Sequence, residues 1–156
     1  MKLLKNAVAI LLIATIISTL VVVPTSIAAN NVTVTVNGTK NYDKANEILE
    51  QTNQERANAG VGELTLDKSL CDYAMMRAAE ISTYFSHTRP NGRIILYDFS
   101  SSGIHIDGEN IAAGSSSSAG AMEQWMTSEG HRENILTSAF NSIGIGSYTS
   151  SGTTWW

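Results

Sequence analysis

The chain has a single cysteine, Cys71, among its 156 residues. One cysteine cannot form an internal disulfide, so hydrophobic burial has to hold the fold together. Cys71 lies in a helical pattern among apolar neighbours, and no Cys-x-x-Cys partner or flanking base accompanies it. We therefore predict that Cys71 is a packed, unreactive thiol rather than a nucleophile.

The first 28 residues have the pattern of a secretory signal peptide. Lys2 and Lys5 precede an apolar run from Ala7 to Val23, and a cleavage site with small residues follows at Ala28. The alternative is an uncleaved anchor, because 17 largely apolar residues approach the length that spans a bilayer. Cleavage leaves about 128 residues, the usual size of one domain. We divide the chain into a signal peptide (1–28), an N-terminal linker (29–42) and one domain (43–156).

The charge of the exported part excludes some functions. Without Lys2 and Lys5 the ten Lys and Arg become eight, against fourteen Asp and Glu, which gives a formal net charge of −6. This acidic balance lacks the basic footprint of a nucleic-acid-binding protein. No second long apolar run follows the signal segment, so we expect no membrane span after cleavage.

Helical periodicity dominates the first part of the domain. Residues 42–59 carry apolar side chains at helical spacing, and Gly60 ends the pattern. Asp67 is placed to cap a second helix that runs out at Ser86 and His87, before a Pro-Asn-Gly turn. Further helical segments are expected at residues 93–99, from a cap at Ser118 to a stop near Gly130, and at residues 131–136.

The tail changes to the period of a strand. Residues 143–148 alternate in a glycine-rich run, residues 150–152 form a turn, and residues 153–156 return as a second strand. An earlier Val-Thr alternation at residues 31–36 is either a strand or part of the linker. Helices first and a hairpin last predict the α+β class.

Three side chains are candidates for a functional site: His87, Glu109 and His131. They lie at the ends of elements or in loops, where a rigid scaffold commonly holds functional groups. Two imidazoles and a carboxylate suit a divalent cation such as Zn²⁺, or a proton-transfer pair without metal. Each candidate is 22 positions from the next, so spacing alone does not place them together. The remaining histidine, His105, is interpreted as a solvated loop residue.

Familiar enzyme motifs are absent from the sequence. The string that starts at His131 lacks the second histidine of a zinc-protease helix. The serines before Gly120 do not form a Gly-x-Ser-x-Gly elbow, and no phosphate-binding glycine loop occurs. Carboxylate pairs such as Glu109 and Glu123 leave glycoside hydrolysis open.

Five short strings follow one another along the chain: Asn53-Gln54-Glu55-Arg56, Leu64-Thr65-Leu66-Asp67, Tyr84-Phe85-Ser86-His87, Gly108-Glu109-Asn110-Ile111, and Trp125 through Gly130-His131-Arg132-Glu133-Asn134-Ile135-Leu136. In this order they resemble the bacterial, disulfide-free branch of the CAP superfamily. Other members of that superfamily are cysteine-rich secretory proteins, insect venom antigens and plant pathogenesis-related proteins. The resemblance covers about residues 43–156.

The resemblance implies an α-β-α sandwich, in which helices cover both faces of a small antiparallel sheet. It also implies a cleft where two histidines and acidic residues converge. His87, Glu109 and His131 match the cleft residues of the family.

Two departures from the family pattern affect these expectations. Eukaryotic relatives carry a second cleft glutamate where this chain has Ser128, so Glu129 is a weaker candidate. The family also extends its last strand beyond the aromatic pair that resembles residues 155–156, so a shortened last strand is expected. Asn110 is a further candidate that would orient cleft groups.

The leading functional hypothesis is a secreted, non-enzymatic binding module whose His87 and His131 are ligands for a metal, with Zn²⁺ as the candidate cofactor. Its partner would be an extracellular or cell-envelope ligand: a lipid, a glycan or a protein. The alternative is a metal-dependent, peptidase-like hydrolase with Glu109 as general base. A third hypothesis gives the histidines only a structural role at the helix ends.

Overall fold

A computed structural model describes residues 35, 37–95 and 105–156 of the chain. The expected signal peptide and most of the Val-Thr run lie outside the described residues, as do residues 96–99 of the short helix expected at 93–99. Within the described ranges, no helix is long and apolar enough to cross a membrane.

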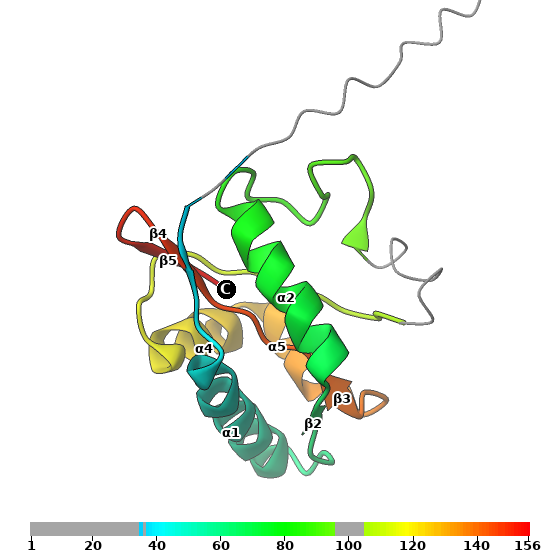
Figure 1. Cartoon of the computed structure of the whole chain (residues 1–156). Coiled ribbons are helices and arrows are strands. Elements are labelled where there is room, and N and C mark those ends of the chain that lie inside the picture. The colour runs from blue at the N-terminus through cyan, green and yellow to red at the C-terminus, as the bar shows by residue number, and fades with distance from the viewer. Residues whose placement is uncertain (1–34, 36, 96–104) are drawn as a thin grey trace, which may run out of the picture. The chain divides into compact units, whose positions relative to one another are not determined.

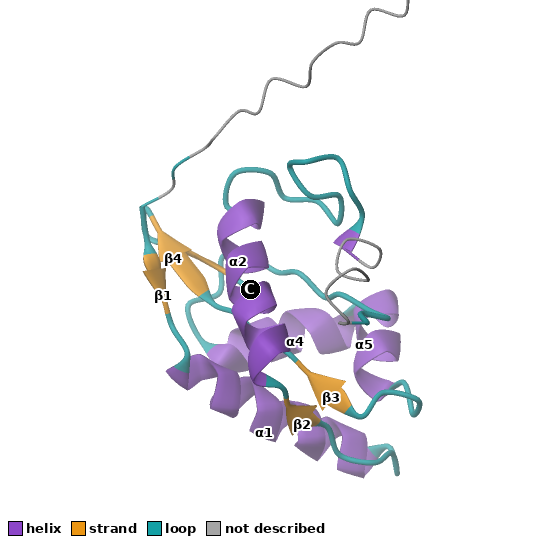
Figure 2. Ribbon diagram, turned by 45° about the vertical axis from the view of Figure 1, so that its right-hand side comes forward, coloured by secondary structure: helices purple, strands orange, loops and turns teal. Residues whose placement is uncertain are grey.

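Helices cover both faces of a small sheet (Figures 1 and 2). α2 lies on one face, and α1, α4 and α5 pack together on the other (Figure 2). This arrangement confirms the α+β class and the predicted α-β-α sandwich. The helices are α1 (Asp43–Asn58), α2 (Lys68–Ile81), α4 (Ser118–Thr127) and α5 (Glu129–Leu136).

The ends of α2 illustrate what local sequence does and does not determine. The carboxylate of Asp67 accepts a hydrogen bond of 2.9 Å from the backbone N–H three residues later, which confirms the predicted cap. The helix ends at Ile81, however, and not at Ser86 and His87. The hydroxyls of Ser82 and Thr83 donate to carbonyls of the last turn at 2.7 and 2.8 Å and so compete with further helix. His87 therefore lies in a loop.

The boundaries of α4 and α5 also differ from expectation. Ser117, and not Ser118, caps α4, because its hydroxyl accepts from a backbone N–H three residues on at 3.2 Å. Ser118 is buried and donates to Glu47 at 2.6 Å. The break between the helices falls at Ser128, whose backbone is extended, and Gly130 lies inside α5.

The main sheet is antiparallel and has the order β1-β4-β5. β4 (Tyr148–Ser150) and β5 (Thr153–Trp155) form a hairpin, as predicted, but its first strand begins at Tyr148 and not at residue 143, and Ser150 lies in β4 rather than in the turn. Its turn, Ser151 and Gly152, has positive φ at both residues, as a two-residue type I′ turn requires. β1 (Thr39–Lys40) pairs with the outer edge of β4, so the last part of the expected linker belongs to the sheet.

Two further pairings surround the hairpin. Ala113 lies opposite Trp155 in an isolated bridge, and Ala112 exchanges backbone hydrogen bonds of 3.0 and 2.8 Å with Trp156. Residues 112–113 are therefore extended and line the other edge of β5. A separate parallel pair joins β2 (Thr65–Leu66) to β3 (Ser142–Ile143), which the sequence pattern did not predict.

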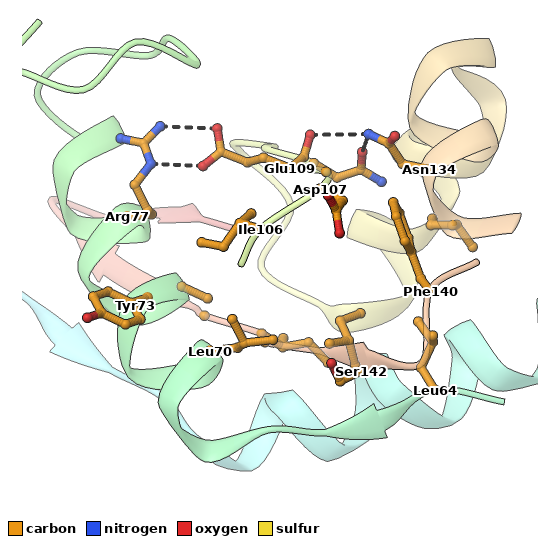
Figure 3. Close-up of a pocket in the computed structure, with 18 of the residues that line it drawn as sticks. Leu64, Leu70, Tyr73, Arg77, Ile106, Asp107, Glu109, Asn134, Phe140 and Ser142 are labelled. Carbon is orange, nitrogen blue, oxygen red and sulfur yellow. Dashed lines mark hydrogen bonds and ion pairs between the residues drawn. The ribbon is translucent and has the colours of Figure 1, made fainter. Parts of the chain in front are cut away.

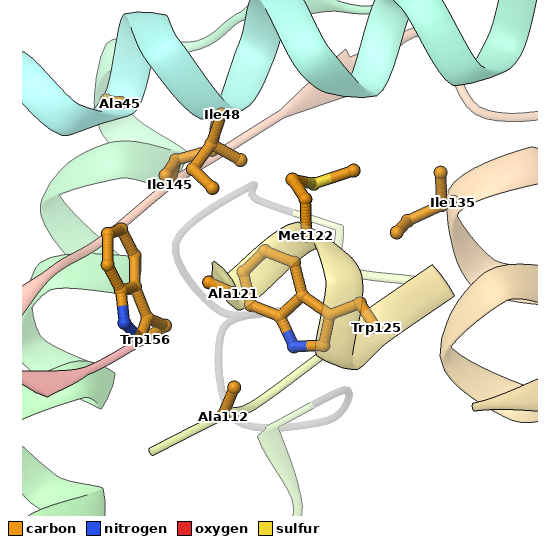
Figure 4. Packing of buried hydrophobic residues seen from close by; sticks show 9 residues of the cluster. All are labelled: Ala45, Ile48, Ala112, Ala121, Met122, Trp125, Ile135, Ile145 and Trp156. Carbon is orange, nitrogen blue, oxygen red and sulfur yellow. The ribbon is translucent and has the colours of Figure 1, made fainter. Parts of the chain in front are cut away.

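The hydrophobic core lies between the sheet and the helices α1 and α4. Ile48, Met122, Trp125, Ile145 and Trp156 belong to one buried cluster (Figure 4). Burial of these side chains is the main stabilising contribution in a chain without disulfides.

Cys71 is buried on α2, and its sulfur accepts a hydrogen bond of 3.5 Å from the N–H of Ile145. Burial raises the pKa of the Cys71 thiol, which disfavours the reactive thiolate. The prediction of a packed thiol is confirmed.

Arg56 is a fully buried charge at the end of α1. Its guanidinium donates to the carbonyls of Gly62, Ile135, Thr137 and Phe140 at 2.6, 2.7, 2.9 and 3.2 Å. Two of these carbonyls belong to the C-terminal end of α5, where helix carbonyls lack intrahelical partners. Arg56 thus ties α1 to α5.

Candidate functional site

The loop after α2 carries His87. It folds back on itself through a bridge between Thr88 and Ile94, with Gly92 at positive φ in the turn. The side chain of His87 is 56% exposed, so its imidazole is accessible from solvent.

A buried ion pair holds the carboxylate of Glu109 beside this loop. Arg77 of α2 donates to the two oxygens of Glu109 at 2.8 and 3.3 Å (Figure 3). Nδ1 of His87 lies 2.9 Å from one of the same oxygens. The side chains of Arg77 and Glu109 are 5% and 11% exposed, so their attraction is little screened by water. The structure therefore places the imidazole of His87 against the carboxylate of Glu109.

Arg77 extends this ion pair into a network. It donates to Glu80 at 2.8 Å and to the carbonyl of Ser86 at 2.8 Å, which anchors the loop beside His87. Arg89 donates to Glu80 from the other side at 3.1 Å. The network consequently alternates positive and negative charges, which is how buried charges are tolerated.

The pKa values of the network follow from this alternation. Burial alone lowers the pKa of Arg77, but hydrogen bonds and charges from Glu109 and Glu80 raise it overall. Burial likewise raises the pKa of Glu80, but Arg89 and Arg77 lower it overall. Both groups are therefore held in their charged forms.

Arg77 and Glu80 were not predicted as site residues from the sequence. Arg77 follows the apolar stripe of α2 and is 4% exposed, although a charged residue on a helix is usually solvated. Two features of the sequence could have indicated this pair: Arg77 follows the apolar stripe of the helix, and Glu80 supplies a carboxylate three residues later on the same helix.

His131 lies near the start of α5 and is held through its backbone. Asn110 donates to the carbonyl of His131 at 2.9 Å, and Asn134 donates to the side-chain oxygen of Asn110 at 2.9 Å. Asn110 therefore links the backbone of His131 to the side chain of Asn134. Nδ1 of His131 is buried and has no hydrogen-bond partner among the described residues.

Burial, followed by the charge of His87, lowers the pKa of the His131 imidazole. His131 is therefore neutral at pH 7, and it lies within electrostatic reach of His87. A neutral imidazole is the form that binds metals.

Among the described residues, neither the weaker candidate Glu129 nor the loop residue His105 joins this group. Glu129 is exposed at the start of α5, and within the described part of the chain no hydrogen bond or ion pair joins it to His87, Glu109 or His131. The side chain of His105 is 79% exposed and pairs with Asp107 at 2.8 Å, in agreement with its interpretation as a loop residue.

Two pockets adjoin the network. A small one of about 190 Å³ is lined by His87, Ile95, Asp107, Glu109 and Asn134, among others. A larger one of about 420 Å³ shares Asp107, Glu109 and Asn134 and is bordered by α2 on one side and by residues of α1, α4 and α5 on the other (Figure 3). We use the name cleft for the small pocket together with His131, which is not among its lining residues but lies within electrostatic reach of His87.

The donor set of the cleft limits the metal sites that it can form. Among the described residues, no group of three or more His, Cys, Asp or Glu side chains is placed to hold a metal ion. Both oxygens of Glu109 already accept hydrogen bonds from Arg77, and one also lies beside His87. Glu109 therefore fits as the outer partner of a ligand histidine rather than as a ligand. Two imidazoles, from His87 and His131, are the donors that remain.

The sequence model of the cysteine-rich secretory protein family, CAP, matches residues 49–156. This chain belongs to the CAP family. A CAP relative from Bacillus subtilis strain 168, the uncharacterized protein YkwD, is 36% identical over 118 residues. The match covers 73% of this chain and 45% of YkwD, so this chain spans less than half the length of that relative.

Solved structures agree with the CAP fold. An extracellular protein from Bacillus anthracis that contains an SCP domain is 28% identical, with a TM-score of 0.59 over 70% of this chain and 38% of that one. An outer surface protein from Borrelia burgdorferi has a TM-score of 0.60 over 76% of this chain and 95% of that one. At 19% identity, the Borrelia structure shows the fold alone.

Proposed function

We propose that this CAP domain is an extracellular, non-enzymatic binding module whose cleft takes its ligand through His87 and His131. The observation that carries the proposal is the fixed arrangement of Arg77, Glu109 and His87. Arg77 fixes the carboxylate of Glu109 by hydrogen bonds, and this carboxylate contacts Nδ1 of His87 and orients its imidazole. The extracellular setting is supported by the signal-peptide pattern and by the similar extracellular and outer-surface proteins.

A divalent cation is the first ligand to test. Nδ1 of His87 contacts Glu109, which leaves Nε2 of an exposed ring for coordination. A carboxylate behind a ligand histidine fixes the ring and raises its basicity. The buried, unpartnered nitrogen of His131 is a group that a ligand would satisfy. His87 and His131 would therefore hold Zn²⁺, and the remaining positions would be filled by water or by donors of the ligand.

The metal-dependent hydrolase has less support. Catalytic zinc sites use three protein ligands and an open position, and the described residues supply two imidazoles. The general base of that hypothesis, Glu109, is bound by Arg77. A tightly paired carboxylate is poorly placed to take a proton from water.

The test is a calorimetric titration of the protein with Zn²⁺. Saturable binding near one ion per chain, lost in the double variant His87→Ala, His131→Ala, is the expected result. His105→Ala is the matched control, because it removes an exposed imidazole outside the cleft and should bind as the parent protein does. Thermal unfolding of each variant shows that it is folded.

A hydrolysis assay on casein with added Zn²⁺ separates the two functional classes. We expect equal background rates in the parent protein and in the double variant. A zinc-dependent rate that disappears in the double variant would establish the hydrolase instead. If a folded parent protein failed to bind Zn²⁺, the metal part of the proposal would be wrong, and lipid, glycan or protein ligands would come next.

A further inference from the structure

The loop that follows α2 exposes large apolar side chains. Among the described residues, five large hydrophobic side chains are exposed to solvent, and three of them belong to residues 82–95. They are Tyr84, Phe85 and Ile94, with exposed fractions of 56%, 53% and 46%. We call residues 82–95 the apolar loop. A concentration of exposed apolar side chains in so short a segment is typical of a surface that binds a partner.

The apolar loop lies at one end of the domain. It begins directly after the end of α2, whereas Leu66 of β2 lies just before the start of the same helix. The 14 residues of α2 span about 21 Å at about 1.5 Å per residue. Figures 1 and 2 show the loop projecting beyond the end of α2, on the side away from β2 and β3. The loop can therefore reach a flat surface while β2 remains distant from it.

Hydrogen bonds and an ion pair fix the backbone of the apolar loop. Arg77 of α2 donates to the carbonyl of Ser86 at 2.8 Å. The backbone N–H of Arg89 donates to the carbonyl of Arg93 at 2.8 Å, and the guanidinium of Arg89 donates to Glu80 at 3.1 Å. A backbone fixed in this way holds the apolar side chains in water, where they contribute no burial energy until a partner covers them.

The charge of the apolar loop differs from that of the rest of the chain. The loop contains two arginines and one histidine but no Asp or Glu, although the exported chain is acidic overall. Glu80 and Glu109, which lie against the loop, both accept hydrogen bonds from Arg77, and Asp107 pairs with His105. The charges of these carboxylates are therefore partly balanced. An anionic surface attracts basic residues that lie near it.

The shape of the loop distinguishes between kinds of partner. Tyr84 and Phe85 line neither of the two pockets described above. Small ligands bind mostly in concave sites, whereas apolar side chains at a projecting end of a domain suit a flat, soft surface. Tyrosine, with an apolar ring and a polar hydroxyl, is enriched at the boundary between lipid and water.

We infer that the apolar loop docks the domain onto the surface of an anionic phospholipid bilayer. Tyr84, Phe85 and Ile94 enter the boundary between headgroups and acyl chains, and the arginines of the loop stay at the level of the headgroups. The signal-peptide pattern is consistent with this partner, because it predicts export of the chain across such a membrane. Three partly inserted side chains give weak, reversible docking rather than permanent anchoring.

Docking of the loop is separate from the proposed metal function. It requires no metal coordination by His87 or His131, and its test is made without Zn²⁺. Zinc titration and membrane docking can therefore fail independently of each other.

The test uses a polarity-sensitive dye at the loop of the full chain. Tyr84→Cys is labelled with the dye NBD, whereas Cys71 stays unlabelled because it is buried and its pKa is raised. Vesicles of phosphatidylglycerol and phosphatidylcholine should raise the NBD fluorescence at least about threefold as the dye leaves water. The matched control carries the dye at Leu66→Cys, an exposed apolar position at the other end of α2. This control should not respond, even where the apolar run at residues 7–23 holds the chain on the vesicle.

Adding Phe85→Ser and Ile94→Ser to the chain labelled at residue 84 should reduce the rise at least about threefold, because less apolar surface enters the bilayer. Leu66→Ser should leave the rise unchanged. The ring of Phe85 lies 6.1 Å from that of Trp155, so Ile94→Ser alone decides the question if the double change prevents folding.

Three results would overturn the inference. The first is no response at residue 84, or an equal response at residues 84 and 66. The second is a rise without vesicles as the protein concentration increases, which would assign the apolar loop to a second copy of the chain. The third is a rise with soluble chitin oligosaccharide but not with vesicles, which would assign the loop to a glycan.

Discussion

Replacing Arg56 by methionine removes a buried guanidinium that joins α1 to α5. Methionine keeps much of the apolar stem, so the substitution acts mainly on hydrogen bonding. The guanidinium donates to four backbone carbonyls at distances from 2.6 to 3.2 Å. In Arg56→Met all of these carbonyls lose their charged donor.

The magnitude follows from the number of carbonyls. A buried polar group left without its partner costs about 1–3 kcal/mol, and relief of the buried charge offsets part of this loss. At about 1 kcal/mol for each carbonyl, Arg56→Met should lower the free energy of unfolding by about 4 kcal/mol. Domains of this size have about 5–15 kcal/mol in total, so the melting temperature should fall by about 15 °C.

Urea unfolding followed by tryptophan fluorescence measures this loss. The control is Lys68→Met, which removes the same charge from a side chain that is 89% exposed and paired only with Asp72 on the surface. We expect the control to unfold close to the parent midpoint. A loss below about 1 kcal/mol in Arg56→Met would refute the stabilising role assigned to Arg56.

Three further changes test the charge network and the cleft. Glu109→Gln removes the charge opposite buried Arg77 and should cost about 3 kcal/mol in urea unfolding; an effect under about 1 kcal/mol would contradict this. The pKa of Glu80 lies below its ordinary 4.5, so its contribution is complete above that pH and is lost as the pH falls through the lowered pKa. Unfolding measured from pH 7 to pH 3 should show this loss, and the same series should be flatter in Glu80→Gln. The pKa of His131 lies below 6.5, so stability should decline as the pH falls from 6.5, where the unfolded chain takes up the proton first. An NMR titration midpoint for His131 above 6.5 would show this reasoning to be wrong.

The parts of the fold that local residues determine could be predicted from the sequence. The cap at Asp67 and the hairpin turn at residues 151–152 each depend on a few neighbouring residues. Helix ends were less predictable, because adjacent hydroxyl residues such as Ser117 and Ser118 compete for the same role. The β2 and β3 pair could not be predicted, since strands of two residues have too short a pattern to detect.

The site residues also include some that could be predicted from the sequence and some that could not. His87, Glu109 and His131 were candidates by residue type and position, and the resemblance to the family matched them to one cleft. The structure places His87 against Glu109. Arg77 was not identified, because only the tertiary fold shows that it forms an ion pair with Glu109. Glu129 was a candidate by sequence position alone, and the rotation of α5 leaves it exposed. Sequence position therefore indicates candidate residues, and tertiary packing determines which of them come into contact.

The most direct test of the cleft follows the imidazole signals of His87, His131 and His105 by ¹H–¹⁵N NMR while Zn²⁺ is added to the protein. We predict that the signals of His87 and His131 shift together and saturate at the same zinc concentration, whereas that of His105 stays unchanged. Independent titration of His87 and His131, or a response confined to His105, would contradict a shared binding cleft.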